Sequence, residues 1–200
     1  MKEACVLGNG TSRLQFNLDE VQSSMTTYGC NALYRDFIPD YLISMDSSMV
    51  DEILKANAHH KTQFWTQHTN RIDDIAKQGE PINFFWGQKE TIDSGNSALT
   101  LALQNGHEVV YMLGFDYSTD ISVLPNVYVG TPNYNKTHVW PAASKRDTQW
   151  VNRLRSILKN YPNQKVIRVN GTRPSDISQI NYSEITIQQF KDTLHARIFV

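Results

Sequence analysis

Short apolar runs alternate along this chain with helix-length amphipathic stretches, and this alternation limits the folds that the chain can adopt. The pattern is typical of an α/β fold with a mainly parallel sheet. The runs predicted to form strands are ACVL (4–7), MTTYGC (25–30), YLISM (41–45), QFWTQ (63–67), INFFW (82–86), VVYMLG (109–114) and KVIRV (165–169).

Longer stretches between these runs have the spacing of helices. Helices are predicted over Met49 to Asn57, Asn96 to Gln104 and Asp147 to Leu158, and Asn105-Gly106 is typical of a helix C-cap. Residues 118–143 are polar, with Pro, Gly, Asn and Thr throughout, so a long loop is predicted there. Such loops are usually active-site lids or disordered segments. No repeat or linker divides the chain, and we expect a single domain over residues 1–200.

The charge balance points to small solutes as partners. The chain has 19 Lys and Arg against 20 Asp and Glu, a net charge of -1, and no basic block that would favour nucleic acid or an anionic membrane. No apolar run approaches the roughly 20 residues of a membrane helix. Cys5 and Cys30 lie in apolar stretches without metal-ligand spacing, so we expect reduced, buried thiols in a cytoplasmic protein, or in the host cytoplasm if the source is a virus. A homo-oligomer is left open.

Polar clusters follow several predicted strands at the point where each strand ends. They are GNGTS (8–12), CNALY (30–34), MDSS (45–48) and GFDYS (114–118), and DSGNS (93–97) opens the helix after the fifth strand. Ligands of open α/β sheets bind at the carboxyl ends of the strands, and helix N-termini attract anions. Together these clusters predict a site for a phosphorylated ligand.

The predicted phosphate-binding residues come from these clusters and from the segment RVNGTRPSD (168–176) after the last predicted strand. They are Gly8, Asn9, Gly10, Thr11, Ser12, Asn31, Ser94, Gly95, Asn96, Tyr117, Arg173 and Ser175. Two glycines and two hydroxyls after a strand can present amides to an anion, although an ordinary tight turn has the same composition. Arg173 can clamp a phosphate or remain a solvated loop residue.

Three carboxylates have both a structural and a functional interpretation. Asp46 can cap the helix that follows it or hold Mg²⁺ beside a substrate phosphate, which makes Mg²⁺ a candidate cofactor. Asp116 can bind ribose or a metal, or only anchor the loop that follows it, and the functional interpretation is favoured. For Asp93 we expect a helix N-cap.

His138 is the candidate general acid or base, because it lies in the long polar loop and imidazole suits proton transfer near neutral pH. A structural role for His138 stays open. The other histidines lack metal-ligand spacing and are predicted to be surface residues: His59, His60, His68, His107 and His195.

Four stretches resemble the DUF115 group, which includes motility accessory factors and archaeal 6-hydroxymethylpterin diphosphokinases. They are GNGTS, PDYLISMD (39–46), DSGNSALTLALQNGHEVVYMLGFDYS (93–118) and THVW (137–140). More distantly, GNGTS, CNALY, SGNSALTLAL and YMLGFDYS are similar to bacterial sialyltransferases with GNGPS, CNQFY and SGVYM-like motifs. These folds are Rossmann-like, so the resemblance implies a three-layer sandwich with a mainly parallel sheet.

The sialyltransferase resemblance also implies roles for single residues. Asn9, Gly10, Ser94 and Gly95 would lie against a cytidine-monophosphate sugar, and Asn31 would lie near its phosphate. Those enzymes have a His as general base in a segment like HYIGHSKNTD. The matching segment here, HVWPAASKRDT, has Ala142 or Ala143 at that position, so a role for His138 cannot be carried over from that base.

Three functions follow from these observations. The first is a glycosyltransferase-like transferase that uses a nucleotide-activated sugar and an unknown acceptor. The second is a Mg²⁺-dependent, pterin-type diphosphokinase with Asp46 and Asp116 as metal ligands. The third is a non-catalytic nucleotide-binding accessory protein, which the alanine at the expected base position favours.

Overall fold

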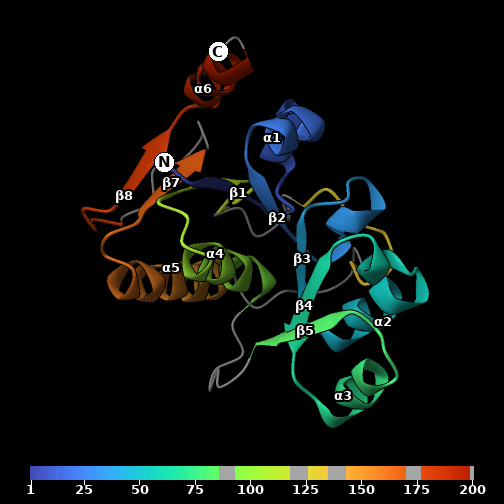
Figure 1. Cartoon of the computed structure of the whole chain (residues 1–200). Coiled ribbons are helices and arrows are strands. Elements are labelled where there is room, and N and C mark those ends of the chain that lie inside the picture. The colour runs from blue at the N-terminus through green and yellow to red at the C-terminus, as the bar shows by residue number, and fades with distance from the viewer. Residues whose placement is uncertain (86–92, 118–125, 135–142, 170–176, 199–200) are drawn as a thin grey trace.

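In the computed structural model, one eight-stranded sheet runs through the molecule (Figure 1). The structure describes residues 1–85, 93–117, 126–134, 143–169 and 177–198, and for 143–148 and 198 it describes the backbone only. The strands are β1 Glu3–Leu7, β2 Thr26–Cys30, β3 Tyr41–Ser44, β4 Gln63–Gln67, β5 Ile82–Phe85, β6 Val109–Leu113, β7 Lys165–Val169 and β8 Tyr182–Ile185. Every pair of neighbouring strands is parallel.

The order of the strands reverses next to β1. The sheet reads β5-β4-β3-β2-β1-β6-β7-β8, so the chain builds one half outward from β1 and then returns to place β6 on the other side of β1. In open α/β sheets, ligands bind outside the carboxyl ends of the strands at such a reversal. A ligand site is therefore expected at the loops that follow β1, β2, β3 and β6.

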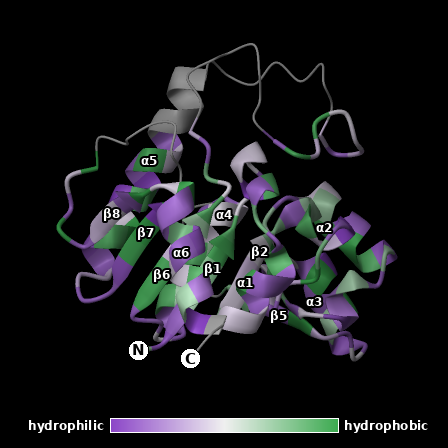
Figure 2. Ribbon diagram, turned by 90° about the horizontal axis from the view of Figure 1, so that it is seen from above, coloured by the Kyte–Doolittle hydropathy of each residue, from purple (hydrophilic) through white to green (hydrophobic). Residues whose placement is uncertain are grey.

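Helices cover both faces of the sheet, which gives three layers. On one face, α4 (Ser94–Gln104) and α5 (Ala143–Asn160) pack on inward residues such as Val6 and Met112. On the other face, α1 (Leu18–Ser24) and α6 (Ile187–Ile198) pack on Leu7 and Leu113, and α2 (Ser47–Lys55) and α3 (Asn70–Lys77) pack on Phe64. Side chains alternate between the faces because the side-chain period of a strand is two. Figure 2 shows the hydrophobic residues gathered on the central strands.

The α/β fold predicted from the sequence is confirmed. All seven predicted strands are present, each within one residue of its predicted bounds. Three helices were predicted in the correct places, although α5 begins earlier, at Ala143. Gly106 has a φ of +78°, which is the left-handed conformation expected of the C-cap after α4. The strand β8 and the helices α1 and α3 were not predicted. Of the predicted loop 118–143, the structure describes residues 126–134 and the backbone of Ala143.

Several predictions about single residues are also decided by burial. Cys5 and Cys30 are buried free thiols, as predicted, and burial raises the pKa of the Cys30 thiol to about 12. His59 and His107 were predicted to be surface residues, and this was wrong: each is no more than 3% exposed. His107 lies between α4 and β6, with its Nε2 at 2.9 Å from the Tyr28 hydroxyl. None of the described helices is both long and apolar enough to span a bilayer.

Candidate functional site

The predicted site residues that the structure describes lie along the carboxyl edge of the sheet. Residues 8–12 follow β1, Asn31 follows β2, Asp46 follows β3, residues 94–96 open α4, and Asp116 and Tyr117 follow β6. His138, Arg173 and Ser175 lie outside the described residues, as does Ala142. The side chain of Ala143 is likewise not described.

The glycine loop after β1, residues 8–12, is closed against the end of β6. The amide of Gly8 donates to the carbonyl of Leu113 (2.8 Å), and the amide of Gly10 donates to the carbonyl of Gly114 (2.9 Å). A Cβ at either Gly8 or Gly10 would lie 2.5 Å from the Gly114 carbonyl oxygen. The glycines therefore allow two backbones to approach each other, and these two amides are already used within the protein.

The Asp116 carboxylate also holds this loop against the end of β6. Its carboxylate accepts from the amide of Ser12 (2.7 Å) and from the hydroxyl of Ser12. Asp116 is half-buried, and both of its carboxylate oxygens are bonded to the loop after β1. Asp116 therefore anchors residues 8–12, which is a different loop from the one after Asp116 that the sequence suggested. Thr11, by contrast, is exposed.

Asn9 points the other way, toward β2. Its Nδ2 donates to the carbonyl of Cys30 (3.2 Å) and to the hydroxyl of Tyr134 (3.3 Å). Its Oδ1 is buried and has no hydrogen-bond partner in the structure. A buried carbonyl oxygen without a donor costs about 1–3 kcal/mol, so this atom is suited to accept from a ligand or a water molecule.

Asn31 joins the ends of β2 and β3. It adopts a left-handed conformation with a φ of +53°, which Asn tolerates better than most residues. Its Oδ1 accepts from the hydroxyl of Ser44 (3.0 Å), and its side chain lies near Asp46 and Tyr134, where its polar interaction acts to lower the pKa of each. The strained backbone thus holds the Asn31 carboxamide between the strand ends and the described part of the long loop.

Asp46 occupies the N-cap position of α2, but its side chain makes no capping hydrogen bond. Partial desolvation raises the pKa of the Asp46 carboxyl, repulsion from Asp93 raises it further, and a hydrogen bond with Asn31 lowers it. The side chain nevertheless retains substantial solvent exposure. The capping interpretation is therefore wrong for the side chain, and an accessible carboxylate with a second carboxylate nearby remains.

The N-terminus of α4 is largely satisfied by its own residues. Asp93 caps the helix by accepting from the Asn96 amide (2.9 Å), as predicted, and it forms an ion pair with Arg153 (3.1 Å). The buried Ser94 hydroxyl accepts from the amide of Met45 at the end of β3 (3.0 Å). Gly95 makes room for the Phe115 ring, which would lie 3.0 Å from an added Cβ.

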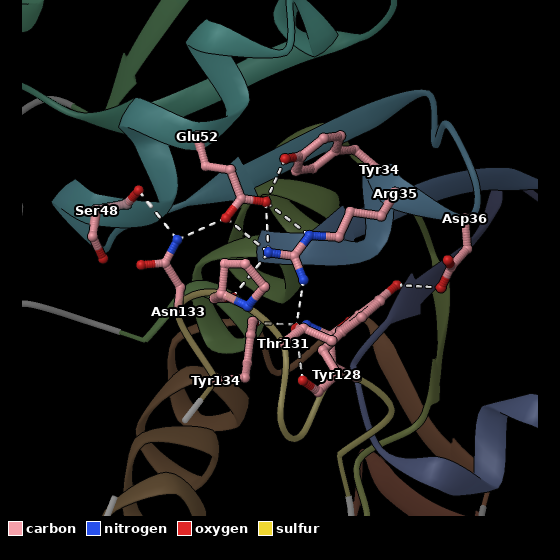
Figure 3. Close-up of polar contacts among 11 residues, drawn as sticks. Tyr34, Arg35, Asp36, Ser48, Glu52, Tyr128, Thr131, Asn133 and Tyr134 are labelled. Atoms are coloured by element: carbon pink, nitrogen blue, oxygen red, sulfur yellow. Dashed lines mark hydrogen bonds and ion pairs between the residues drawn. The ribbon is translucent and has the colours of Figure 1, made fainter. Parts of the chain in front are cut away.

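Residues 126–134, the described part of the long loop, are held against the site by two groups of polar contacts (Figure 3). In the first, Arg35 forms two hydrogen bonds of 2.7 Å with the Glu52 carboxylate and a third with the Thr131 hydroxyl. Asn133 donates to the same carboxylate (2.7 Å). Burial alone would raise the pKa of Glu52, but hydrogen bonds from Tyr34 and Arg35 lower it.

In the second group, the buried Arg13 donates to the Tyr128 hydroxyl (2.7 Å), which donates to Asp36 (2.7 Å). The amide of Val127 donates to the carbonyl of Asn9 (2.9 Å). Sequence reasoning missed Arg13, Arg35 and Glu52. The available signal was that both arginines directly follow strand-end clusters, but the partners that join them to residues 126–134, Tyr128 and Thr131, lie about a hundred residues further along the chain.

The end of β7 contributes a second buried cation. Arg168 is 1% exposed, pairs with Glu184 at 3.0 Å, and donates to the carbonyl of Phe115 (3.1 Å). Its guanidinium lies 5.1 Å from the centroid of the Tyr117 ring, and Tyr117 is buried. The turn after β6 is therefore fixed from two sides, by Ser12 and by Arg168.

No protein-family model matches the chain, and no curated protein matches its sequence. Among solved structures, a point mutant of the α-2,3/8-sialyltransferase CstII is similar with a TM-score of 0.52 and 13% identity, covering 84% of this chain and 81% of that chain. The sialyltransferase CST-II in complex with a trisaccharide acceptor and CMP aligns with a TM-score of 0.49 and 13% identity, covering 84% and 80%. At this identity, the first likeness shows that the chain has a fold similar to that of a sialyltransferase.

Proposed function

We propose that the chain is a glycosyltransferase-like enzyme that binds a nucleotide-activated sugar at the carboxyl edge of β1, β2 and β3 and transfers the sugar to an acceptor. The observation that carries this proposal is the pair of carboxamides, Asn9 and Asn31, which meet beside Tyr134 on a sheet with a sialyltransferase-like fold. Asn9 also presents a buried oxygen without a donor. The resemblance in sequence implies the same two residues as contacts of the donor nucleotide.

The roles of the other residues follow from their contacts. The N-terminus of α4 lies at the same edge, so its dipole favours the departing nucleotide phosphate. Thr11 is the exposed hydroxyl of the loop after β1 and is the natural phosphate donor there. Gly8, Gly10, Ser12 and Asp116 shape that loop rather than contact the phosphate through the atoms that are already bonded.

A second candidate function, the Mg²⁺-dependent pterin-type diphosphokinase, is favoured by the repulsion between Asp46 and Asp93. A divalent cation would relieve this repulsion, and carboxylate and carboxamide oxygens are suitable Mg²⁺ ligands. Because the Asp116 oxygens are bonded to Ser12, the ligands would be Asp46 and its neighbours rather than Asp46 with Asp116. The third candidate is an accessory protein that binds the nucleotide without turnover.

A thermal-shift screen separates these candidates. Stabilisation by CMP supports the transferase, stabilisation by ATP only together with Mg²⁺ supports the diphosphokinase, and no stabilisation by either contradicts both. Asn31→Asp should abolish the CMP response, because it replaces an amide donor by a carboxylate beside the phosphate. Asn57→Asp is the matched control, since Asn57 also has a φ of +53° but precedes β4 at the opposite edge. An equal loss in both variants would show a general effect of the charge.

Turnover separates the transferase from the accessory protein. If His138 is the general acid or base, His138→Ala should reduce transfer from a CMP-sugar donor roughly a hundredfold to ten-thousandfold while leaving CMP affinity unchanged. The pH profile of the variant should lose a limb near neutrality. Full activity in the variant would assign the proton transfer elsewhere, and a large drop in melting temperature would show that His138 is a structural residue.

A further inference from the structure

Three metal-ligating side chains meet at the amino edge of the sheet, opposite the candidate nucleotide site. His59 and His60 belong to the short 3₁₀ helix η3 (Ala58–His60) before β4, and Glu80 precedes β5. The Nε2 atoms of His59 and His60 lie 2.7 Å and 2.9 Å from Oε2 of Glu80. The three ligand atoms all lie within 4.8 Å of one another.

We propose that His59, His60 and Glu80 form a site for a divalent transition-metal ion, with Zn²⁺ as the best fit. Two imidazole nitrogens and one carboxylate oxygen make a donor set typical of zinc sites that keep one open position. Mg²⁺ and Ca²⁺ prefer oxygen ligands, so this donor set selects against them. The site is separate from the one at the carboxyl edge and does not depend on its proposed function.

The three ligand atoms need to move only slightly apart to hold a zinc ion. Ligand atoms around tetrahedral zinc lie roughly 3.3 Å apart, because each bond is about 2.0–2.1 Å long. Here the two nitrogens are within 3 Å of the oxygen, as hydrogen-bonded groups are. His60 is 49% exposed and Glu80 is 37% exposed, so both can move outward, while His59 is 3% exposed and serves as the fixed ligand. The exposed side of the cluster leaves room for a water ligand.

The surroundings of His59 set an upper limit to the affinity for zinc. The Nδ1 atom of His59 is buried and has no hydrogen-bond partner. When Nε2 binds a metal, Nδ1 carries the proton and normally donates it to a neighbouring group, and loss of such a partner lowers metal affinity about 10–100-fold. We therefore expect weaker zinc binding than at a closed structural site.

Metal binding here would connect two segments at the outer end of the sheet. The connection from α2 to β4 carries both histidines, and the connection from α3 to the edge strand β5 carries Glu80. A ligand that binds only the folded state stabilises it in proportion to its concentration over its dissociation constant. Zn²⁺ should therefore raise the melting temperature of the protein.

The test is isothermal titration of the untagged, EDTA-treated full chain with ZnCl₂, together with melting curves. We expect one zinc per chain and a higher melting temperature, and no response to MgCl₂ at this site. His60→Ala and Glu80→Gln should each weaken zinc binding by at least about tenfold, because a direct ligand contributes no less than an outer-shell partner. His68→Ala is the matched control: His68 also faces a carboxylate, Asp73 at 3.5 Å, but does not belong to the group of three ligands found among the described residues, and its loss should leave binding unchanged. Absence of zinc binding in the parent protein, or equal affinity in His60→Ala, would overturn the proposal.

Discussion

The loop after β1 and the turn after β2 lie side by side at the same edge of the sheet, but they use their polar groups differently. In the first, the amides of Gly8, Gly10 and Ser12 are all bonded to the end of β6. In the second, Asn31 is held in a left-handed conformation next to Asp46, whose carboxyl has a raised pKa. The backbone of the glycine-rich loop thus forms a closed structural joint with the end of β6. The groups left for a ligand are the buried Oδ1 of Asn9, the exposed Thr11 hydroxyl and, beside the turn after β2, the Asp46 carboxylate.

This difference shows that a glycine-rich loop after a strand has two interpretations that composition cannot separate. Both a phosphate cradle and a close contact between backbones require residues without a Cβ. At the reversal point of this sheet the loops after β1 and β6 are neighbours, and their contact accounts for Gly8, Gly10 and Gly114.

The largest effect is expected from Gly10→Val. Its Cβ would lie 2.5 Å from the Gly114 carbonyl oxygen and 2.7 Å from the Asp116 carboxyl, and the backbone of the joint cannot move aside. Such overpacking should lower the free energy of unfolding by about 3 kcal/mol, measured by urea denaturation. Gly95→Ala is the control, because its Cβ would meet side chains rather than backbone, the Phe115 ring at 3.0 Å and the Asp93 carboxylate at 3.5 Å. A Gly10→Val variant as stable as the parent would show that the loop after β1 does not pack closely against Gly114 and Asp116.

A smaller effect is expected from Asp116→Asn. The variant replaces a carboxylate that accepts two hydrogen bonds from Ser12 by an amide that accepts less strongly and presents a donor to one of them. We expect a loss of about 2 kcal/mol in the free energy of unfolding. In a double-mutant cycle with Ser12→Ala, the two effects should be non-additive by at least about 0.5 kcal/mol. Additive effects would mean that Asp116 stabilises something other than this loop.

Asp46→Asn should raise the free energy of unfolding rather than lower it. An acid whose pKa is raised in the folded state destabilises that state once the pH passes from the unfolded pKa, about 3.9, through the raised folded value. The free energy of unfolding of the parent therefore falls as the pH rises through this range. Asp46→Asn should be more stable than the parent at pH 7 and equal to it below about pH 4. Solvent exposure keeps the gain under about 1 kcal/mol.

Urea denaturation at both pH values measures this effect, and melting curves with Mg²⁺ extend it. If a cation binds beside Asp46 and Asp93, any Mg²⁺ stabilisation should disappear in Asp46→Asn and persist in Asp116→Asn. The reverse pattern would restore the interpretation of Asp116 as a metal ligand. A lower stability of Asp46→Asn at pH 7 would show that hydrogen bonding with Asn31 outweighs the repulsion from Asp93.

The sequence predicted the strands well because a strand buried on both faces is an almost continuous apolar run. The four residues of β8, YSEI, are each only partly buried, so this strand gives no such signal. The helices α1 and α3 are short, with seven and eight residues, and each buries one residue, Val21 and Ile72. Their N-caps, Asn17 and Thr69, were signals in the sequence that the search for longer apolar patterns passed over.

The position of the candidate site was predictable, but its connections were not. Polar clusters after parallel strands meet at one edge whatever the details of the fold, which placed Asn9, Asn31 and Asp46 near one another. Which atoms remain available depends on contacts across more than a hundred residues, such as Ser12 with Asp116 and Arg13 with Tyr128. His59 and Glu80 are only 21 residues apart, but they too meet because β4 and β5 are neighbours in the sheet.

The smallest effect on stability, and the sharpest test of the comparison, is expected from Thr11→Ala. Thr11 is exposed, so the change in the free energy of unfolding should stay within about 0.5 kcal/mol. If the Thr11 hydroxyl binds a nucleotide phosphate, CMP affinity measured by calorimetry should fall about tenfold, which is the contribution of about 1.4 kcal/mol from one hydrogen bond to a charged group. Ser12→Ala should give the opposite result, with lower stability and nearly unchanged affinity, because the Ser12 hydroxyl is bonded to Asp116. If Thr11→Ala keeps full affinity while Asn31→Asp loses it, the turn after β2, rather than the Thr11 hydroxyl, contacts the phosphate.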